Sequence, residues 1–173
     1  MGRDKLLLKY MGKSILQHSV ELLSELPVYE RILVTSEERT ELPDLPPDIV
    51  SVINPQPEAG ISASIQTGIT AATGSSYMFL TADQPKLLLA DILPLITAAG
   101  ENPDKIVFPV IDSNPNSPTI FPESFRTELL NLTGDYGGRV VRDAHREFCL
   151  GIIPANPGNF SDVDNKEDYC GLF

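Results

Sequence analysis

The chain has 173 residues, enough for one domain around one hydrophobic core, and its 42% hydrophobic and 21% charged residues argue against a disordered or fibrous protein. Its 24 acidic and 13 basic residues give a net charge of -11, which disfavours nucleic acid and anionic membrane surfaces as partners. No apolar run is long enough for a membrane helix, and neither Cys149 nor Cys170 belongs to a CxxC pair. We therefore expect a single domain over residues 1–173, in the reducing cytoplasm.

Helical and strand-like patterns alternate along the chain. The first helix is expected over residues 13–26, because Ile15, Leu16 and Val20 recur on one face and Ser14 can cap its start. Apolar strands are expected at 30–36, 49–55, 77–85 (ending in polar residues), 105–111, 117–122 and 148–155. Further helices are expected at 61–74, with Gly74 as its stop, and at 88–100, 123–132, 138–147 and 165–172. This alternation indicates an α/β fold with a mainly parallel sheet and helices on both faces.

The first candidate site residue is Asp83 in FLTADQP, one step beyond a buried strand. In an open parallel sheet, ligands bind beyond the carboxyl ends of the strands. A carboxylate there suits a Mg²⁺ ligand facing a triphosphate, although a turn or helix N-cap Asp explains the same letters equally well.

The second candidate is GISAS at 60–64, which begins a predicted helix. Gly60 permits close backbone approach, and Ser62 and Ser64 offer hydroxyl and amide groups to an anion or a base edge. Ordinary capping by Ser is the alternative explanation.

The third candidate is SDVDNKED at 161–168, where Asp162 and Asp164 point the same way along an extended segment and could approach one metal ion. A solvated turn with an Asp cap is the alternative. GDYGGRVV could form an anion loop with Arg139 as a clamp, a weak pattern by itself. His18 and His145 lie inside helical patterns without a nucleophile motif, which disfavours a hydrolase triad.

Five segments, in order, resemble the MobA-like nucleotidyltransferase family and, within it, the molybdopterin cytidylyltransferase branch. MGRDKLLL and the following GKSIL resemble the end of the family's LAAGxSxRMGxxK motif and its G-K-P-L-L continuation. NPQPEAGISASIQTG resembles N-P-x-x-x-x-G-M-S-x-S-L-x-x-G, and LTADQP resembles L-x-G-D-Q-P. GDYGGR resembles G-D-x-G-A-R, and DVDNKEDY resembles D-I-D-T-P-E-D-Y.

The resemblance implies a Rossmann-like, three-layer α/β nucleotidyltransferase fold that uses Mg²⁺ and a nucleoside triphosphate, whose α-phosphorus is attacked by a phosphorylated acceptor. Its implied site residues, by role, are Lys5 and Asp83 for catalysis; Gly2, Lys5, Gly60, Ser62 and Ser64 for the nucleotide; Asn116, Ser117 and Arg139 for the acceptor; and Asp83, Asp164 and Asp162 for the metal. Such chemistry asks for charge stabilisation rather than a protein nucleophile.

The expected reaction is transfer of CMP from CTP to a molybdopterin-type acceptor, with release of pyrophosphate, in molybdenum cofactor maturation. A molybdoenzyme is a possible partner. Two departures lie within the matched part: Ala82 replaces a Gly of the motif, and SNPNSPTIF stands where cytidylyltransferases often have G-H-P-x-x-F. The second leaves open a transferase for a sugar or polyol phosphate. The absent first half of the Gly-rich loop leaves open a non-catalytic nucleotide- or cofactor-binding relative that assists molybdoenzyme maturation.

The largest departure from the family pattern is at the front. The family's first strand and the first half of its Gly-rich loop precede the residues that match MGRDK, so we expect the first strand to be missing from the sheet. An initiation codon assigned too late would explain this, as would a real loss. Either way, we expect a gap in the sheet beside residues 30–36, or a segment that has moved to fill it.

Overall fold

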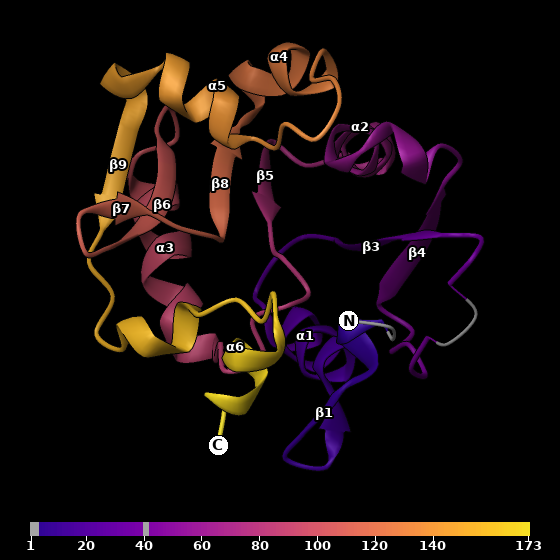
Figure 1. Cartoon of the computed structure of the whole chain (residues 1–173). Coiled ribbons are helices and arrows are strands. Elements are labelled where there is room, and N and C mark those ends of the chain that lie inside the picture. Colours follow the sequence, from indigo (N-terminus) through magenta and orange to yellow (C-terminus); the bar gives the residue numbers. More distant parts are fainter. Residues whose placement is uncertain (1–3, 40–41) are drawn as a thin grey trace.

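A computed structural model describes residues 4–39 and 42–173 (Figure 1). The strands are β1 (Lys9–Tyr10), β2 (Lys13–Ser14), β3 (Arg31–Ser36), β4 (Ile49–Asn54), β5 (Ser76–Phe79), β6 (Ile106–Ile111), β7 (Asn114–Pro115), β8 (Thr119–Pro122) and β9 (Cys149–Ile152). The α-helices are α1 (Ile15–Glu25), α2 (Ile61–Ala71), α3 (Leu89–Glu101), α4 (Arg126–Leu130), α5 (Arg139–Ala144) and α6 (Lys166–Cys170).

The strands and helices expected from the sequence are present in the expected order, with differences at element ends, and the short strands β1, β2 and β7 are additional to those expected. Ser14 caps α1 as expected, because its side chain accepts a hydrogen bond from the backbone N–H of Gln17. The predicted stop at Gly74 is wrong by three residues, since α2 ends at Ala71 and the chain turns extended at Ala72. The strand expected at 77–85 ends at Phe79, so Asp83 lies on the loop that follows.

The strands form two main groups. β3 and β4 pair in parallel over their whole length, from Arg31 opposite Ile49 to Ser36 opposite Asn54. The other group is a five-stranded sheet in the order β5-β8-β6-β7, with β9 parallel to β6. β8 runs antiparallel to both β5 and β6, so the five-stranded sheet mixes parallel and antiparallel pairs.

Helices cover both faces of the strands, which gives the expected three-layer α/β architecture. Ile106 and Phe108 of β6 belong to a core cluster that takes in residues of α2, α4 and α5. Val107, between them in the sequence, packs instead with Leu95 of α3 and Ile120 of β8. This alternation follows from the two-residue period of a strand. Figure 1 shows α2, α4 and α5 on one side of the strands and α1 and α6 on the other.

A gap separates β3 from β5. Among the described residues, no strand pairs with the edge of β3 opposite β4, and β5 pairs only with β8. A cavity of about 1020 Å³ lies between them, and apolar side chains of β3, β5, α1 and α2 line much of it, including Val34, Phe79, Val20 and Ile65. The expected gap beside residues 30–36 is therefore present, and no described segment has moved to fill it.

The first described residues lie between the carboxyl ends of β3 and β5. Asp4 forms an ion pair of 2.6 Å with Arg39, three residues beyond β3. Lys5 forms an ion pair of 2.8 Å with Asp83, on the loop after β5. These contacts bring the two strand ends to the same edge, where an α/β sheet binds its ligands. None of the helices in the described ranges is long and apolar enough to cross a bilayer.

Candidate nucleotide and metal site

Asp83 is the centre of the candidate site. Its side chain is 21% exposed, and its Oδ2 accepts a hydrogen bond of 2.8 Å from the Lys5 ammonium group. Its Oδ1 is buried and has no hydrogen-bond partner among the described residues. A buried carboxylate oxygen without a partner is unfavourable, so this oxygen remains available to a cation or a donor.

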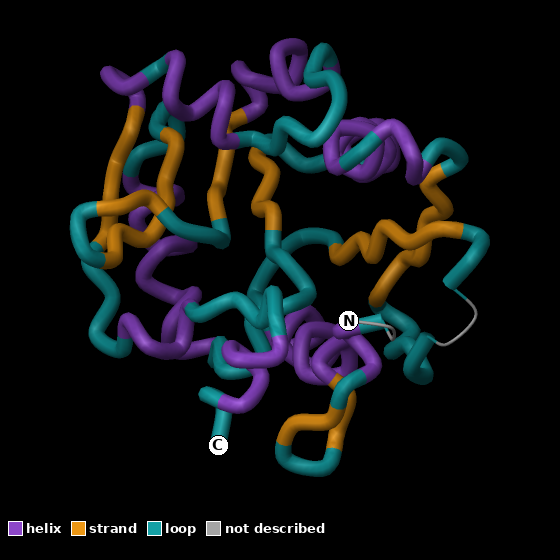
Figure 2. Tube along the Cα trace, in the orientation of Figure 1, coloured by secondary structure: helices purple, strands orange, loops and turns teal. Residues whose placement is uncertain are grey.

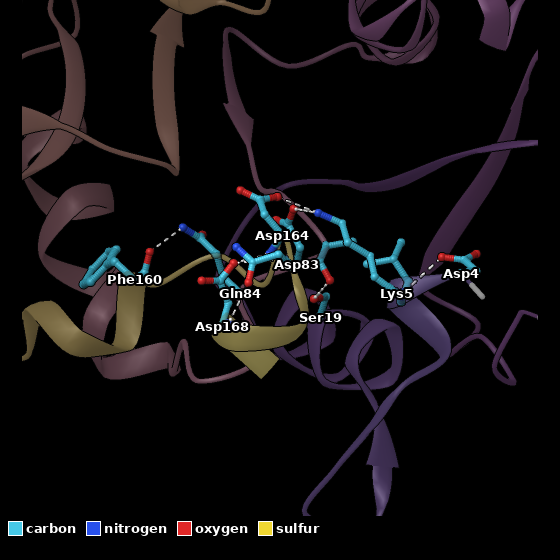
Figure 3. A network of polar contacts seen from close by, with 11 residues as sticks. Asp4, Lys5, Ser19, Asp83, Gln84, Phe160, Asp164 and Asp168 are labelled. Atoms are coloured by element: carbon cyan, nitrogen blue, oxygen red, sulfur yellow. Dashed lines mark hydrogen bonds and ion pairs between the residues drawn. The ribbon is translucent and has the colours of Figure 1, made fainter. Parts of the chain in front are cut away.

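Asp164 approaches the same ammonium group from the opposite end of the chain. Its Oδ1 accepts a hydrogen bond of 2.8 Å from Lys5 (Figure 3). Its backbone is fixed locally, because Asp168 Oδ2 accepts from the N–H groups of Asp164 and Asn165 in the capping box of α6. The segments after β5 and before α6 are loops (Figure 2), and they contain Asp83 and Asp164. The N–H of Val163 joins these loops by donating 2.9 Å to the carbonyl of Asp83.

Lys5 begins a short 3-10 helix, Lys5–Leu7, which Asp4 caps by accepting from the backbone N–H of Leu6. Burial by itself lowers the pKa of Lys5, but the hydrogen bonds and charges of Asp164 and Asp83 outweigh it, so the pKa is raised. Lys5 therefore remains protonated at neutral pH. Its ammonium group demonstrates that the two carboxylates can hold one cation between them.

Asp162 contributes charge to this cluster without a direct contact to Lys5. Burial of its carboxyl group, together with the negative charges of Asp83 and Asp164, raises its pKa to about 6. Within residues 4–39 and 42–173, no three acidic, His or Cys side chains converge as a metal-binding group. Asp83 and Asp164 still fit Mg²⁺, which binds through one or two carboxylates beside substrate phosphates. The position of the Lys5 ammonium and the free Oδ1 of Asp83 both support this fit.

The segment 60–64 packs against the loop that contains GDYGGR. Gly60 has a φ of +89°, and a Cβ there would lie 2.4 Å from Asp135 Oδ1, so only Gly fits. The N–H of Ser62 donates 3.2 Å to the carbonyl of Gly134. Ser62 is buried and its hydroxyl turns back to Ala59, whereas Ser64 lines the cavity between β3 and β5.

The acceptor candidates lie near the same cavity. Ser117 lines it, as does Arg139, which is exposed at the start of α5. Asn116 Oδ1 accepts a hydrogen bond of 2.7 Å from the N–H of Ser117, which fixes the turn before the cis peptide bond to Pro118. The structure thus places Ser64, Ser117 and Arg139 around one space. Gly2, the remaining expected nucleotide contact, lies outside the described residues.

Residues 1–148 match the family of MobA-like NTP transferase domains. The chain belongs to the MobA-like NTP transferase family. It is 31% identical over 113 residues to a probable molybdenum cofactor guanylyltransferase of Rhodopirellula baltica, a match that covers 62% of this chain and 53% of that protein. The chain therefore spans about half the length of this curated relative.

Solved structures extend the likeness over almost the whole chain. Rv0371c from Mycobacterium tuberculosis, in complex with manganese, is 20% identical with a TM-score of 0.71, covering 99% of this chain and 92% of that one. The 2-C-methyl-D-erythritol 4-phosphate cytidylyltransferase of Thermus thermophilus is 12% identical with a TM-score of 0.71, covering 97% and 91%. At these identities the likeness establishes the Rossmann-like fold.

Two residues of this MobA-like chain that received no role from the sequence are buried at the site. Asn54, which ends β4 and is 2% exposed, donates 3.1 Å from Nδ2 to Ser64 Oγ. Gln84, also 2% exposed, follows Asp83 directly. Both lie within matched motifs, NPQP and LTADQP, and that position was the available signal. Ala82 is not among the described residues with positive φ, so its methyl group requires no strained backbone.

Proposed function

We propose that this chain is a nucleotidyltransferase that joins the α-phosphate of a nucleoside triphosphate to a phosphorylated acceptor and releases pyrophosphate. The observation that carries the proposal is the Lys5 ammonium group held 2.8 Å from both Asp83 and Asp164, at the carboxyl end of β5. Two carboxylates and a lysine at such an edge suit a triphosphate and a divalent cation.

The chain's own residues act by binding and positioning. Asp83 and Asp164 would hold Mg²⁺, which, when bound, neutralises charge on the phosphate oxygens. Lys5 would contact the triphosphate and stabilise the negative charge that develops on the leaving pyrophosphate. The acceptor's own phosphate supplies the attacking oxygen, so no nucleophilic side chain is needed. This agrees with the lack of a Ser or Cys nucleophile motif in the sequence.

For the substrates we propose CTP and a molybdopterin-type acceptor, as the order of the five segments suggests. Ser64 and the backbone at Gly60 would face the nucleotide, while Asn116, Ser117 and Arg139 would face the acceptor. GTP is the second candidate donor, because the Rhodopirellula baltica relative is named a guanylyltransferase. A reducing cytoplasm, where molybdopterin would be made and used, is the proposed location.

The test is pyrophosphate release by the purified chain with each of CTP, GTP, ATP and UTP, combined with molybdopterin or with sugar and polyol phosphates, in Mg²⁺ or Mn²⁺. Turnover with CTP and molybdopterin is expected, and it should be lost in Lys5→Ala and retained in Lys86→Ala, whose ammonium group contacts only the carbonyl of Gly171 among described residues. Turnover with another pair would reassign the substrates. Saturable nucleotide binding without turnover for any pair would instead support a non-catalytic relative.

A further inference from the structure

The amide side chain of Gln84 is buried where an apolar side chain of similar size would be less destabilising. Its side chain is one of the largest in the described chain that is almost fully buried, at 2% exposed. Its Nε2 donates 2.8 Å to the carbonyl of Phe160, but its Oε1 is buried without a partner among the described residues. An unsatisfied buried amide oxygen is destabilising by about 1–3 kcal/mol. Packing and stability by themselves therefore do not account for Gln84.

The contacts of Gln84 join three segments that carry different parts of the site. Gln84 follows Asp83, and its bond to the carbonyl of Phe160 reaches the segment that leads to Asp164 (Figure 3). The same Nε2 lies 3.4 Å from Asn116 Oδ1 and 3.5 Å from the carbonyl of Ser117. The amide therefore links the loop after β5, the segment before α6 and the turn before β8.

The link to the turn before β8 differs from the link to Phe160. The two loops that contain Asp83 and Asp164 are already joined by the backbone hydrogen bond from Val163 to Asp83. Among the described residues, no backbone hydrogen bond joins the loop of Asp83 to Asn116 or Ser117, because the N–H of Asn116 donates to Pro109 and that of Ser117 to its neighbour's side chain. Gln84 provides the polar connection between the loop of Asp83 and the turn at Asn116 and Ser117.

We infer that Gln84 is a positioning residue that sets the turn at Asn116 and Ser117 relative to the carboxylates Asp83 and Asp164. The inference rests on the proposed function, since it assigns the turn to the acceptor. The Nε2 group holds the turn and the segment before α6 at one point, so the acceptor phosphate and the α-phosphate meet in a fixed geometry. Positioning of this kind contributes to transfer without any contact to substrate.

The decisive variant is Gln84→Met, which keeps the volume and removes the amide. It should raise KM for the acceptor by about three- to tenfold, the effect of one lost hydrogen bond, with KM for the triphosphate unchanged. The melting temperature of Gln84→Met should equal or exceed that of the parent chain, because an unsatisfied buried oxygen is removed.

Hydrogen exchange gives a readout that does not need turnover. Amide groups of residues 112–119 should exchange faster in Gln84→Met. Gln66→Met is the matched control, because Gln66 Nε2 makes a similar bond of 2.7 Å to the carbonyl of Leu132, away from the site. It should leave both the acceptor KM and the exchange of 112–119 unchanged.

The inference is overturned if Gln84→Met leaves the acceptor KM unchanged, or raises both KM values together while lowering the melting temperature. If no acceptor or triphosphate is turned over by the parent chain, the proposed function fails separately. Exchange at residues 112–119 then decides the inference alone, and an unchanged rate there refutes the link.

Discussion

The five-stranded sheet and the β3–β4 pair are built from similar apolar strands but differ in how completely they are buried. Ile106 and Val107 of β6 are 0% exposed, because partner strands lie on both sides and helices cover both faces. In β3 every residue remains partly exposed, since one edge faces the cavity. The difference shows that apolar sequence alone does not bury a strand. Here the strand with a neighbour on each edge is the more completely buried one.

The same division runs through the candidate site. Asp83 and the turn at Ser117 belong to loops of the five-stranded sheet, whereas Asn54 at the end of β4 holds Ser64 on α2. We therefore expect metal and acceptor binding to depend mainly on the well-packed sheet. Binding of the nucleoside should be more sensitive to changes around the cavity.

The largest effect is expected for Asp83→Ala, which tests the part of the site carried by the five-stranded sheet. Loss of a cation ligand should reduce cation-dependent pyrophosphate release by at least about a hundredfold, as for other residues that stabilise transition-state charge. Circular dichroism should be unchanged, because Asp83 lies on a loop and leaves one oxygen unpaired among the described residues. Asp104→Ala, an exposed change away from the site, should retain activity. Equal rates in the two variants would contradict the metal assignment.

The next effect tests the gap between β3 and β5 directly. A short apolar extension fused before Met1, able to form a strand between β3 and β5, should raise the melting temperature by several degrees. Burying even one or two large apolar side chains contributes about 1.5–3 kcal/mol each, and 1 kcal/mol corresponds to about 2–4 °C in a domain of this size. Amide exchange in β3 should also slow. The same extension with two prolines should have neither effect, and equal melting temperatures for the two proteins would refute the prediction.

Gly60→Ala tests the contact between segment 60–64 and the GDYGGR loop. Ala at this position would have to adopt the positive φ of Gly60, and its Cβ would approach Asp135 Oδ1 to 2.4 Å. Urea unfolding should therefore show a free energy of unfolding lower by about 1–3 kcal/mol. Gly100→Ala in α3 is the matched control, because nothing lies within 4 Å of its new Cβ. That change should stabilise by about 0.5–1 kcal/mol. A Gly60→Ala variant as stable as the parent would place the loops further apart than described.

The smallest effect concerns Asp162, whose pKa is raised from 3.8 to about 6 by burial and by the charges of Asp83 and Asp164. Its protonated form is favoured in the folded chain, so its contribution to stability is full below about pH 4 and is lost as pH rises through about 6. The free energy of unfolding of Asp162→Asn, minus that of the parent, should therefore be larger at pH 7.5 than at pH 4.5. The gain should be no more than about 1 kcal/mol, because the carboxyl group is only partly buried and the side chain as a whole remains open to solvent screening. Urea unfolding in EDTA at both pH values measures this difference between variant and parent. The same difference at both pH values would contradict the raised pKa of Asp162.

Much of the fold could be predicted from the sequence because the signals are local. The apolar stripe and Ser14 cap define α1, and short apolar runs define β3, β4 and β6. The reversed direction of β8 could not be predicted, since strand direction depends on which neighbour it pairs with. Gln84 could be located in a motif, but its role depends on a carbonyl 76 positions later in the chain.

The sequence by itself determined the element order, the family resemblance and the strand-end position of Asp83, because periodicity, caps and motif order are written along the chain. Only the tertiary structure decided that Lys5 lies between Asp83 and Asp164, that Gly60 meets Asp135, and that the edge of β3 faces a cavity. These are contacts between residues far apart in sequence, and they arise from how sheets and helices pack rather than from any local pattern.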